Sequence, residues 1–194
     1  MSASRGDIWD AVETASLAAF GPASLAAFGP AVSQSHGITA SLRRAGRYAV
    51  IDSSAHEIVV DRLAVLLGLV AAGLAQGPSP ANDTASWLVQ FLLERVGRES
   101  LEKTLAMAES GSIEANRGGT RLISAFSSQA KVVASRSIRR LLPAAVDYAK
   151  RTVKRDQAHA RHLFAAMLRP HGTRNEFAAL GWNPTDADIQ TLRA

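Results

Sequence analysis

Two histidines are the only candidates for metal chemistry that the spacing of residues suggests. His159 and His162 are three residues apart, so on a helix they would share a face and could bind a metal ion. A zinc site needs a third ligand, and no nearby carboxylate is placed to supply it. His56-Glu57 is followed by Val60 where a zinc protease has its second histidine. The chain also lacks cysteine, which excludes disulfides, thiolate metal sites and cysteine nucleophiles. We therefore predict no metal site.

The patterns of common catalytic sites are missing as well. The segment 117–120, Arg-Gly-Gly-Thr, contains glycines but lacks the lysine and the preceding strand of a phosphate-binding loop, and we interpret it as a turn. The segment 109–114 contains serine and glutamate, but not in the Gly-x-Ser-x-Gly order of a nucleophile elbow. We therefore predict that the chain is not an enzyme and that it binds no cofactor.

Positive charge is concentrated near the C-terminal end of the chain. The net charge is +5. Between residues 131 and 175, where many lysines and arginines lie, the only acidic residues are Asp147 and Asp156. Such a basic face can bind nucleic acid, anionic lipid or an acidic protein, or it can be the solvated surface of a helix. The candidate partner-binding residues are Arg136, Arg139, Arg140, Lys150, Arg151, Lys154, Arg155 and Arg161.

Nucleic-acid binding through the face of residues 131–174 is one alternative. Contacts of these cations with phosphates would be strongly salt dependent. Tyr148 is the only aromatic residue close to them, so a platform for stacking single-stranded bases is poorly supported. The segment 152–158 is too basic and too long for the compact turn of a helix-turn-helix.

The elements that must position these residues are predicted to be helical. Apolar residues recur at three- and four-residue steps from Ile138 to Ala149, which predicts an amphipathic helix. A short apolar run over 162–168 follows, and then a weaker helix over 175–180 that ends at Gly181. Thr185 or Asp186 could cap a last short helix. No long stretch alternates with a period of two, so we predict an all-α fold. Further helices are expected over 7–20, 39–51, 57–74, 86–96, 100–109 and 122–133.

This order of elements resembles the repeat unit of the Clp N-terminal domain, the helical module in front of bacterial Clp unfoldase ATPases. The run 162–168, His-Leu-Phe-Ala-Ala-Met-Leu, is similar to the family's His-Leu-Leu-x-Ala-Leu-Leu helix, and Leu180-Gly181 to the Leu-Gly that follows it. Ser-Leu-Arg-Arg at 41–44 resembles Ser-Ile-Arg-Arg at 137–140, and 61–67 resembles 160–167, which indicates a degenerate first copy. That copy departs from the family because Leu63 stands where the histidine is expected.

The resemblance implies a helical bundle of two pseudo-repeats. Residues 1–36 would form an N-terminal helical extension, and 37–194 a domain with repeat 1 at about 39–75, an enlarged connector over 76–134 and repeat 2 at about 135–194. The resemblance also implies structural roles for His162, Leu163, Leu168 and Gly181.

The function that the resemblance implies is non-catalytic protein or peptide binding. Because the chain has no ATPase phosphate loop, it would act as a stand-alone adaptor, decoy or recruiting domain. The partner would be an acidic or phosphorylated protein or peptide, with Clp ATPase or protease components as candidates. A nucleic-acid-associated regulator that uses the basic face of residues 131–174 is the alternative.

The N-terminal region contains a tandem duplication. Residues 15–22, Ala-Ser-Leu-Ala-Ala-Phe-Gly-Pro, are repeated as residues 23–30. The repeat is either a peptide that docks on a partner through Leu17, Phe20, Leu25 and Phe28, or an arm that packs on its own domain, which we prefer. The start of the chain is not typical of a secretory signal. The longest apolar run, 63–75, is too short to span a membrane. We expect a cytoplasmic protein.

Overall fold

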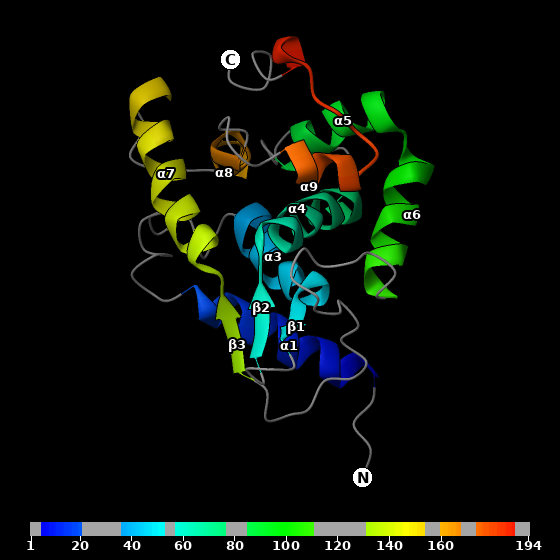
Figure 1. Ribbon diagram of the computed structural model, residues 1–194, viewed down its shortest axis with the longest axis vertical. Coiled ribbons are helices and arrows are strands. Elements are labelled where there is room, and N and C mark those ends of the chain that lie inside the picture. Colours follow the sequence, from blue (N-terminus) through cyan, green and yellow to red (C-terminus); the bar gives the residue numbers. More distant parts are fainter. Residues whose placement is uncertain are drawn as a thin grey trace.

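Helices make up most of the chain that the structure describes. The computed structural model describes residues 5–20, 36–52, 57–76, 85–110, 131–153, 160–167 and 174–188. The expectation of a predominantly helical fold is confirmed for these ranges (Figure 1). The helices are α1 (Arg5–Ala19), α3 (His36–Ala45), α4 (Arg62–Gln76), α5 (Ala85–Val96), α6 (Arg98–Glu109), α7 (Arg136–Val153), α8 (Ala160–Met167) and α9 (Arg174–Ala179), with the 3-10 turn η2 (Gly46–Tyr48) after α3.

Three short strands form a sheet that the sequence did not lead us to expect. Strand β2 (Glu57–Val60) pairs antiparallel with β1 (Val50–Asp52) and parallel with β3 (Lys131–Ala134), so β2 is the central strand. In β2 only Ile58 and Val60 are buried, and alternation over four residues is too short to be told from the first turn of a helix. The expected helices over 39–51, 57–74 and 122–133 were therefore wrong at residues 50–51, 57–60 and 131–133.

Helix α4 forms the centre of the hydrophobic core. It is buried from Leu63 to Ala72, which explains why its sequence is apolar on every side. Helix α3 crosses it at Gly68, where an added Cβ atom would lie 2.7 Å from the backbone nitrogen of Ala45 and closer still to the carbonyl oxygen of Ser41. The crossing therefore requires glycine. In the described part of the chain, no helix, α4 included, is long and apolar enough to cross a membrane.

Helix α1 packs on α3 and η2 through a polar contact as well as apolar ones. The buried hydroxyl of Ser16 donates a 2.7 Å hydrogen bond to the carbonyl oxygen of Leu42, and Phe20 is buried. Ser16 and Phe20 belong to the first copy of the duplicated segment. The described part of this copy, residues 15–20, therefore packs on its own domain, in agreement with the preferred interpretation. The second copy, with Leu25 and Phe28, lies outside the described residues.

The segment after α9 is fixed to α5 by aromatic contacts. Helix α9 ends in a Schellman motif at Gly181, where φ is 76°. The N–H of Trp182 donates to the carbonyl of Phe177, and the N–H of Gly181 to that of Ala178. The rings of Phe177 and Trp182 stand edge to face with centroids 5.2 Å apart, and Trp182 lies 5.5 Å from Phe91 of α5. The expected end of this helix at Gly181 is thus observed.

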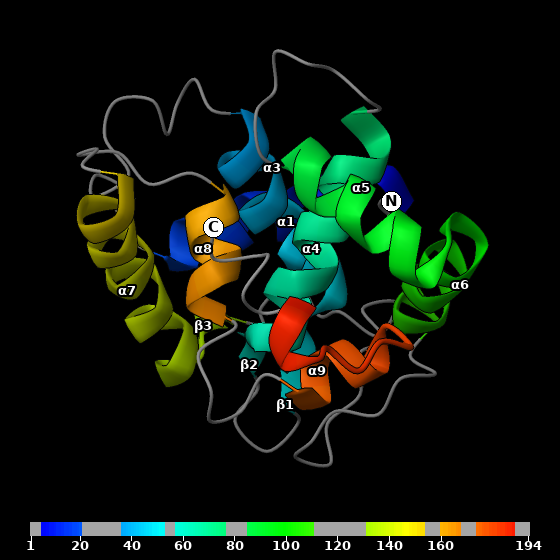
Figure 2. The ribbon, with the colours of Figure 1, turned by 90° about the horizontal axis from the view of Figure 1, so that it is seen from above.

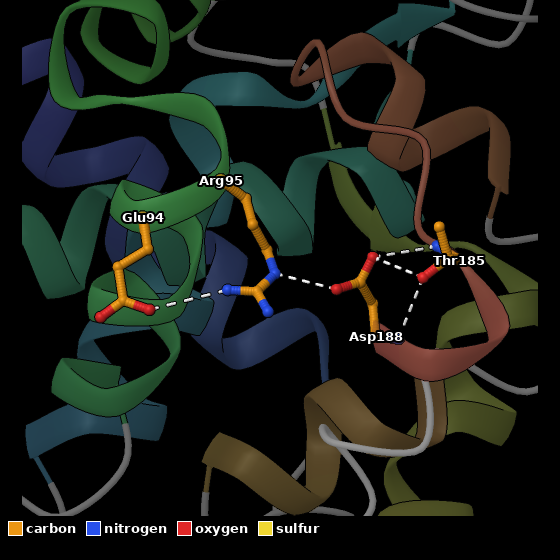
Figure 3. Close-up of polar contacts among 4 residues, drawn as sticks. All are labelled: Glu94, Arg95, Thr185 and Asp188. Atoms are coloured by element: carbon orange, nitrogen blue, oxygen red, sulfur yellow. Dashed lines mark hydrogen bonds and ion pairs between the residues drawn. The ribbon is translucent and has the colours of Figure 1, made fainter.

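An arginine on α5 holds the last described residues (Figure 3). The guanidinium of Arg95 lies over the ring of Phe91, and its Nε donates a 2.9 Å hydrogen bond to Oδ1 of Asp188. Thr185 and Asp188 cap each other, because the N–H of Asp188 donates to Oγ1 of Thr185 and Oδ2 of Asp188 accepts from the N–H of Thr185. The bonds from Arg95 and Thr185 hold the pKa of Asp188 below its usual value. Thr185 is therefore the N-cap of the helical turn over 186–188.

Replacing Gly68 by alanine is expected to destabilise the protein by about 2–3 kcal/mol, because the added methyl group must push α3 away from α4. Helix propensity alone predicts the opposite sign, a gain of about 0.5–1 kcal/mol. The free energy of unfolding in urea distinguishes the two. Ala106→Gly, at an exposed position of α6, measures the propensity effect by itself. A Gly68→Ala variant at least as stable as the wild type would contradict the close crossing.

Candidate binding surface

Helix α7 positions most of the predicted binding residues. It begins after Ser135, whose carbonyl oxygen accepts hydrogen bonds from the N–H groups of Ile138 and Arg139. One face of the helix packs on the core, and this fixes the rotation of the helix and decides which residues face solvent. The buried residues on that face are Ile138, Leu141, Leu142, Ala145, Val146 and Ala149.

The opposite face of α7 is positively charged. At 100° per residue, its cations project within a sector of about 120°. Figure 2 shows α7 at the edge of the molecule, on the side opposite α6. The expected amphipathic helix is therefore present, with its polar side turned outward. We call this face the basic stripe and define it by the exposed residues Arg136, Arg139, Arg140, Lys150 and Arg151.

Pro143 lies inside α7 and is exposed on the same face. It has no N–H to donate to the carbonyl of Arg139, and its ring crowds that carbonyl. A proline on the solvent side favours a bend toward the core, the direction in which surface helices generally curve. The helix accordingly keeps buried residues on both sides of the proline, with Ile138 before it and Ala149 after it.

The cations of the basic stripe form no ion pairs with described residues. Arg139 is tied to the main chain, because its Nε donates a 3.1 Å hydrogen bond to the carbonyl of Ala134. On other described elements, Arg44 of α3 donates to the carbonyl of Ala71, and four further arginines are paired with carboxylates, whose negative charge balances them. These pairs are Arg47–Glu13, Arg62–Glu176, Arg95–Asp188 and Arg98–Glu102. The basic stripe therefore gives this face a net positive charge, and the exposed Asp147 on the same face pairs with none of the five cations.

The structure does not place every predicted binding residue. Lys154 and Arg155 lie outside the described residues, and Arg161 is in α8 but its side chain is not described. The five cations of α7 are the predicted residues that the fold brings together. Lys131, at the start of β3, is exposed as well.

Two of the residues with expected structural roles, His162 and Leu163, lie in the packed interior, whereas Gly181 lies at an exposed position after α9. His162 is buried in α8, and its ring centroid is 6.1 Å from that of Tyr148 in α7. Leu163 is fully buried, whereas Leu168 lies outside the described residues, as does His159. In the described ranges, no group of three or more histidines and carboxylates is arranged to hold a metal ion.

A second group of charges joins three helices at partly buried positions. Arg62, at the start of α4, donates through Nη2 to the carbonyl of Met167 at the end of α8, at 2.9 Å. Its Nε is 3.6 Å from Oε1 of Glu176 in the first turn of α9. Burial raises the pKa of Glu176, and the nearby backbone N–H and Arg62 oppose this only in part. No sequence pattern indicates this contact, because Arg62 is far in the sequence from Met167 and Glu176.

Glu176→Gln is expected to become increasingly more stable than the wild type as the pH rises above 4.5. Because the pKa of Glu176 is raised in the folded protein, the folded state keeps a proton that the unfolded chain releases, so stability falls as pH rises through this window. Glutamine cannot ionise, so the stability of the variant does not fall for this reason. Urea unfolding between about pH 4 and 7 measures the difference in stability between the variant and the wild type. Glu99→Gln, at an exposed position of α6, is the control. Identical pH dependence of the variant and the wild type would refute this assignment.

Comparisons with known proteins identify no family for this chain. No family model matches the sequence, and neither a curated protein nor a solved structure matches it significantly. The resemblance to the Clp N-terminal domain thus stays a prediction that rests on the residues of the sequence.

Proposed function

We propose that this chain is a non-catalytic binding module that takes an acidic or phosphorylated segment of a protein partner on the basic stripe. The observation that carries this proposal is the set of exposed cations on one face of α7, which form no ion pair with described residues. Guanidinium groups match carboxylates and phosphates through paired hydrogen bonds. Because the other face of α7 is buried, the helix holds the backbone of these residues in place before a partner binds.

The strength of such a surface indicates which partners suit it. An exposed ion pair contributes about 0.2–1 kcal/mol, so five pairs with carboxylates give roughly 1–5 kcal/mol. A millimolar dissociation constant corresponds to about 4.1 kcal/mol. A hydrogen bond to a charged group contributes about 1.5–3 kcal/mol, and one phosphate accepts several from arginine. A phosphorylated partner would therefore bind more tightly than a merely acidic one.

The resemblance to the Clp N-terminal domain extends the proposal to a stand-alone adaptor, decoy or recruiting domain. The order of α7, α8 and α9 supports repeat 2, and α3 with α4 supports repeat 1, since the two helices of each pair pack together. Two features depart from equal repeats. Strands β1 and β2 separate α3 from α4, and α3 has 10 residues where α7 has 18.

Nucleic-acid-associated regulation is the second candidate, favoured by the net charge of +5 and the isoelectric point of about 10.2. Duplex phosphates could meet the same side chains, and binding would then weaken steeply with salt. Tyr148 is half-buried near His162, so it offers no platform on which bases could stack.

A pull-down from a cell lysate, with and without nuclease, tests the proposal. The variant reverses four exposed cations of the basic stripe in Arg136→Glu, Arg140→Glu, Lys150→Glu and Arg151→Glu, and it leaves Arg139 to bond Ala134. We expect a protein partner that resists nuclease to bind the wild type and to be lost from this variant. Circular dichroism and urea unfolding check that the variant folds.

The control variant reverses Arg98 and Lys103 on α6, on the opposite side of the molecule (Figure 2), and should keep the partner. A partner that the basic-stripe variant still captures would rule out this surface. Capture of nucleic acid alone, lost on nuclease treatment, would overturn the proposal in favour of the second candidate.

A further inference from the structure

The cations of the basic stripe fall into two clusters. If the function proposed above holds, this division indicates how the acidic residues of the partner are spaced. One cluster is Arg136, Arg139 and Arg140, and the other is Lys150 and Arg151. At 1.5 Å per residue, their centres lie about 18 Å apart along the helix. The outward surface between them carries the exposed residues Pro143 and Asp147.

Asp147 makes this interval unfavourable for an anion. Its carboxylate is exposed and forms no ion pair with described residues, although Lys150 and Arg151 are one turn away. A ligand with an unbroken row of negative charges along α7 would gain no electrostatic attraction where it passes Pro143. It would be repelled by the carboxylate of Asp147. Like charges one turn apart on a helix oppose each other about as strongly as opposite charges attract.

We infer that the partner presents an extended acidic segment with two acidic clusters whose centres are five to six residues apart, and that Asp147 selects this spacing. An extended chain advances about 3.3 Å per residue, so five to six residues span the roughly 18 Å between the two clusters of α7. The neutral residues between the acidic clusters lie over Pro143 and Asp147. There the carboxylate of Asp147 can accept a hydrogen bond from a peptide N–H or a hydroxyl group.

The same argument disfavours duplex nucleic acid laid along α7. A duplex carries one negative charge per about 1.7 Å of its axis, so its charge has no interval to match Asp147. A protein segment can place neutral residues there. The charge pattern of α7 therefore favours a protein partner over a polyanion of uniform charge.

Two synthetic peptides test the inference by NMR titration at low salt. One has two glutamate pairs separated by four serines, and the other has eight consecutive glutamates. We expect Asp147→Asn to tighten binding of the unbroken peptide about three- to fivefold, the effect of one exposed charge pair, and not to tighten binding of the spaced peptide. Asp10→Asn, at an exposed position of α1, removes one negative charge elsewhere and should change neither affinity.

The outcomes separate this inference from the proposed function. If Asp147→Asn tightens both peptides equally, Asp147 acts only through net charge and the inference fails, while the proposed function stands. If neither peptide binds the wild type, and neither does the spaced peptide with phosphoserine in place of glutamate, the proposed function fails as well. A duplex oligonucleotide that binds the wild type more tightly than both peptides would overturn the inference and favour nucleic acid as the partner.

Discussion

The absence of a side chain at Gly68 is the condition on which the rest of the fold depends. It lets the backbone of α3 lie against α4 at a distance that no Cβ atom would permit. Helix α1 packs on α3 and η2, while α4 contacts α5, α6, α8 and α9. A wider crossing would separate these two halves of the core. At Gly68 the closest neighbour of α4 is the backbone of α3 and not a layer of side chains. Helix α3 can therefore cover this side of α4, while other elements cover the remaining sides.

Arginine has different roles in two parts of this structure. Arg62 of α4 is partly buried against α8 and α9, and its guanidinium contacts both the carbonyl of Met167 and the carboxylate of Glu176. The arginines of the basic stripe face solvent because Ile138, Leu142 and their neighbours on the other face of α7 are buried. They form no ion pair with a carboxylate of the described residues. The burial of one face of α7 thus creates the charged surface on the other face. A binding surface of this kind needs no cavity, only a helix that cannot rotate.

Sequence reasoning predicted the features that depend on local periodicity. The residues of α7 that face solvent follow from a 3.6-residue repeat sustained over five turns, so the basic stripe could be predicted before its position was known. Strands β2 and β3 could not be predicted, because each has only four residues and their pairing joins segments that are far apart in the sequence. The crossing at Gly68 and the contact of Arg62 with Glu176 also depend on packing between distant segments, on which periodicity carries no information.

The position of β2 at the centre of the sheet has a consequence for the order of assembly during synthesis. Strand β1 leaves the ribosome before β2, so this antiparallel pair can form early. The other edge of β2 has no partner until the chain has been extended to Ala134. A nascent chain must therefore carry one open strand edge, a template for unwanted pairing, through the synthesis of α4, α5 and α6. Helix α7 follows β3 directly, so the segment that closes this edge is the one that delivers the basic stripe.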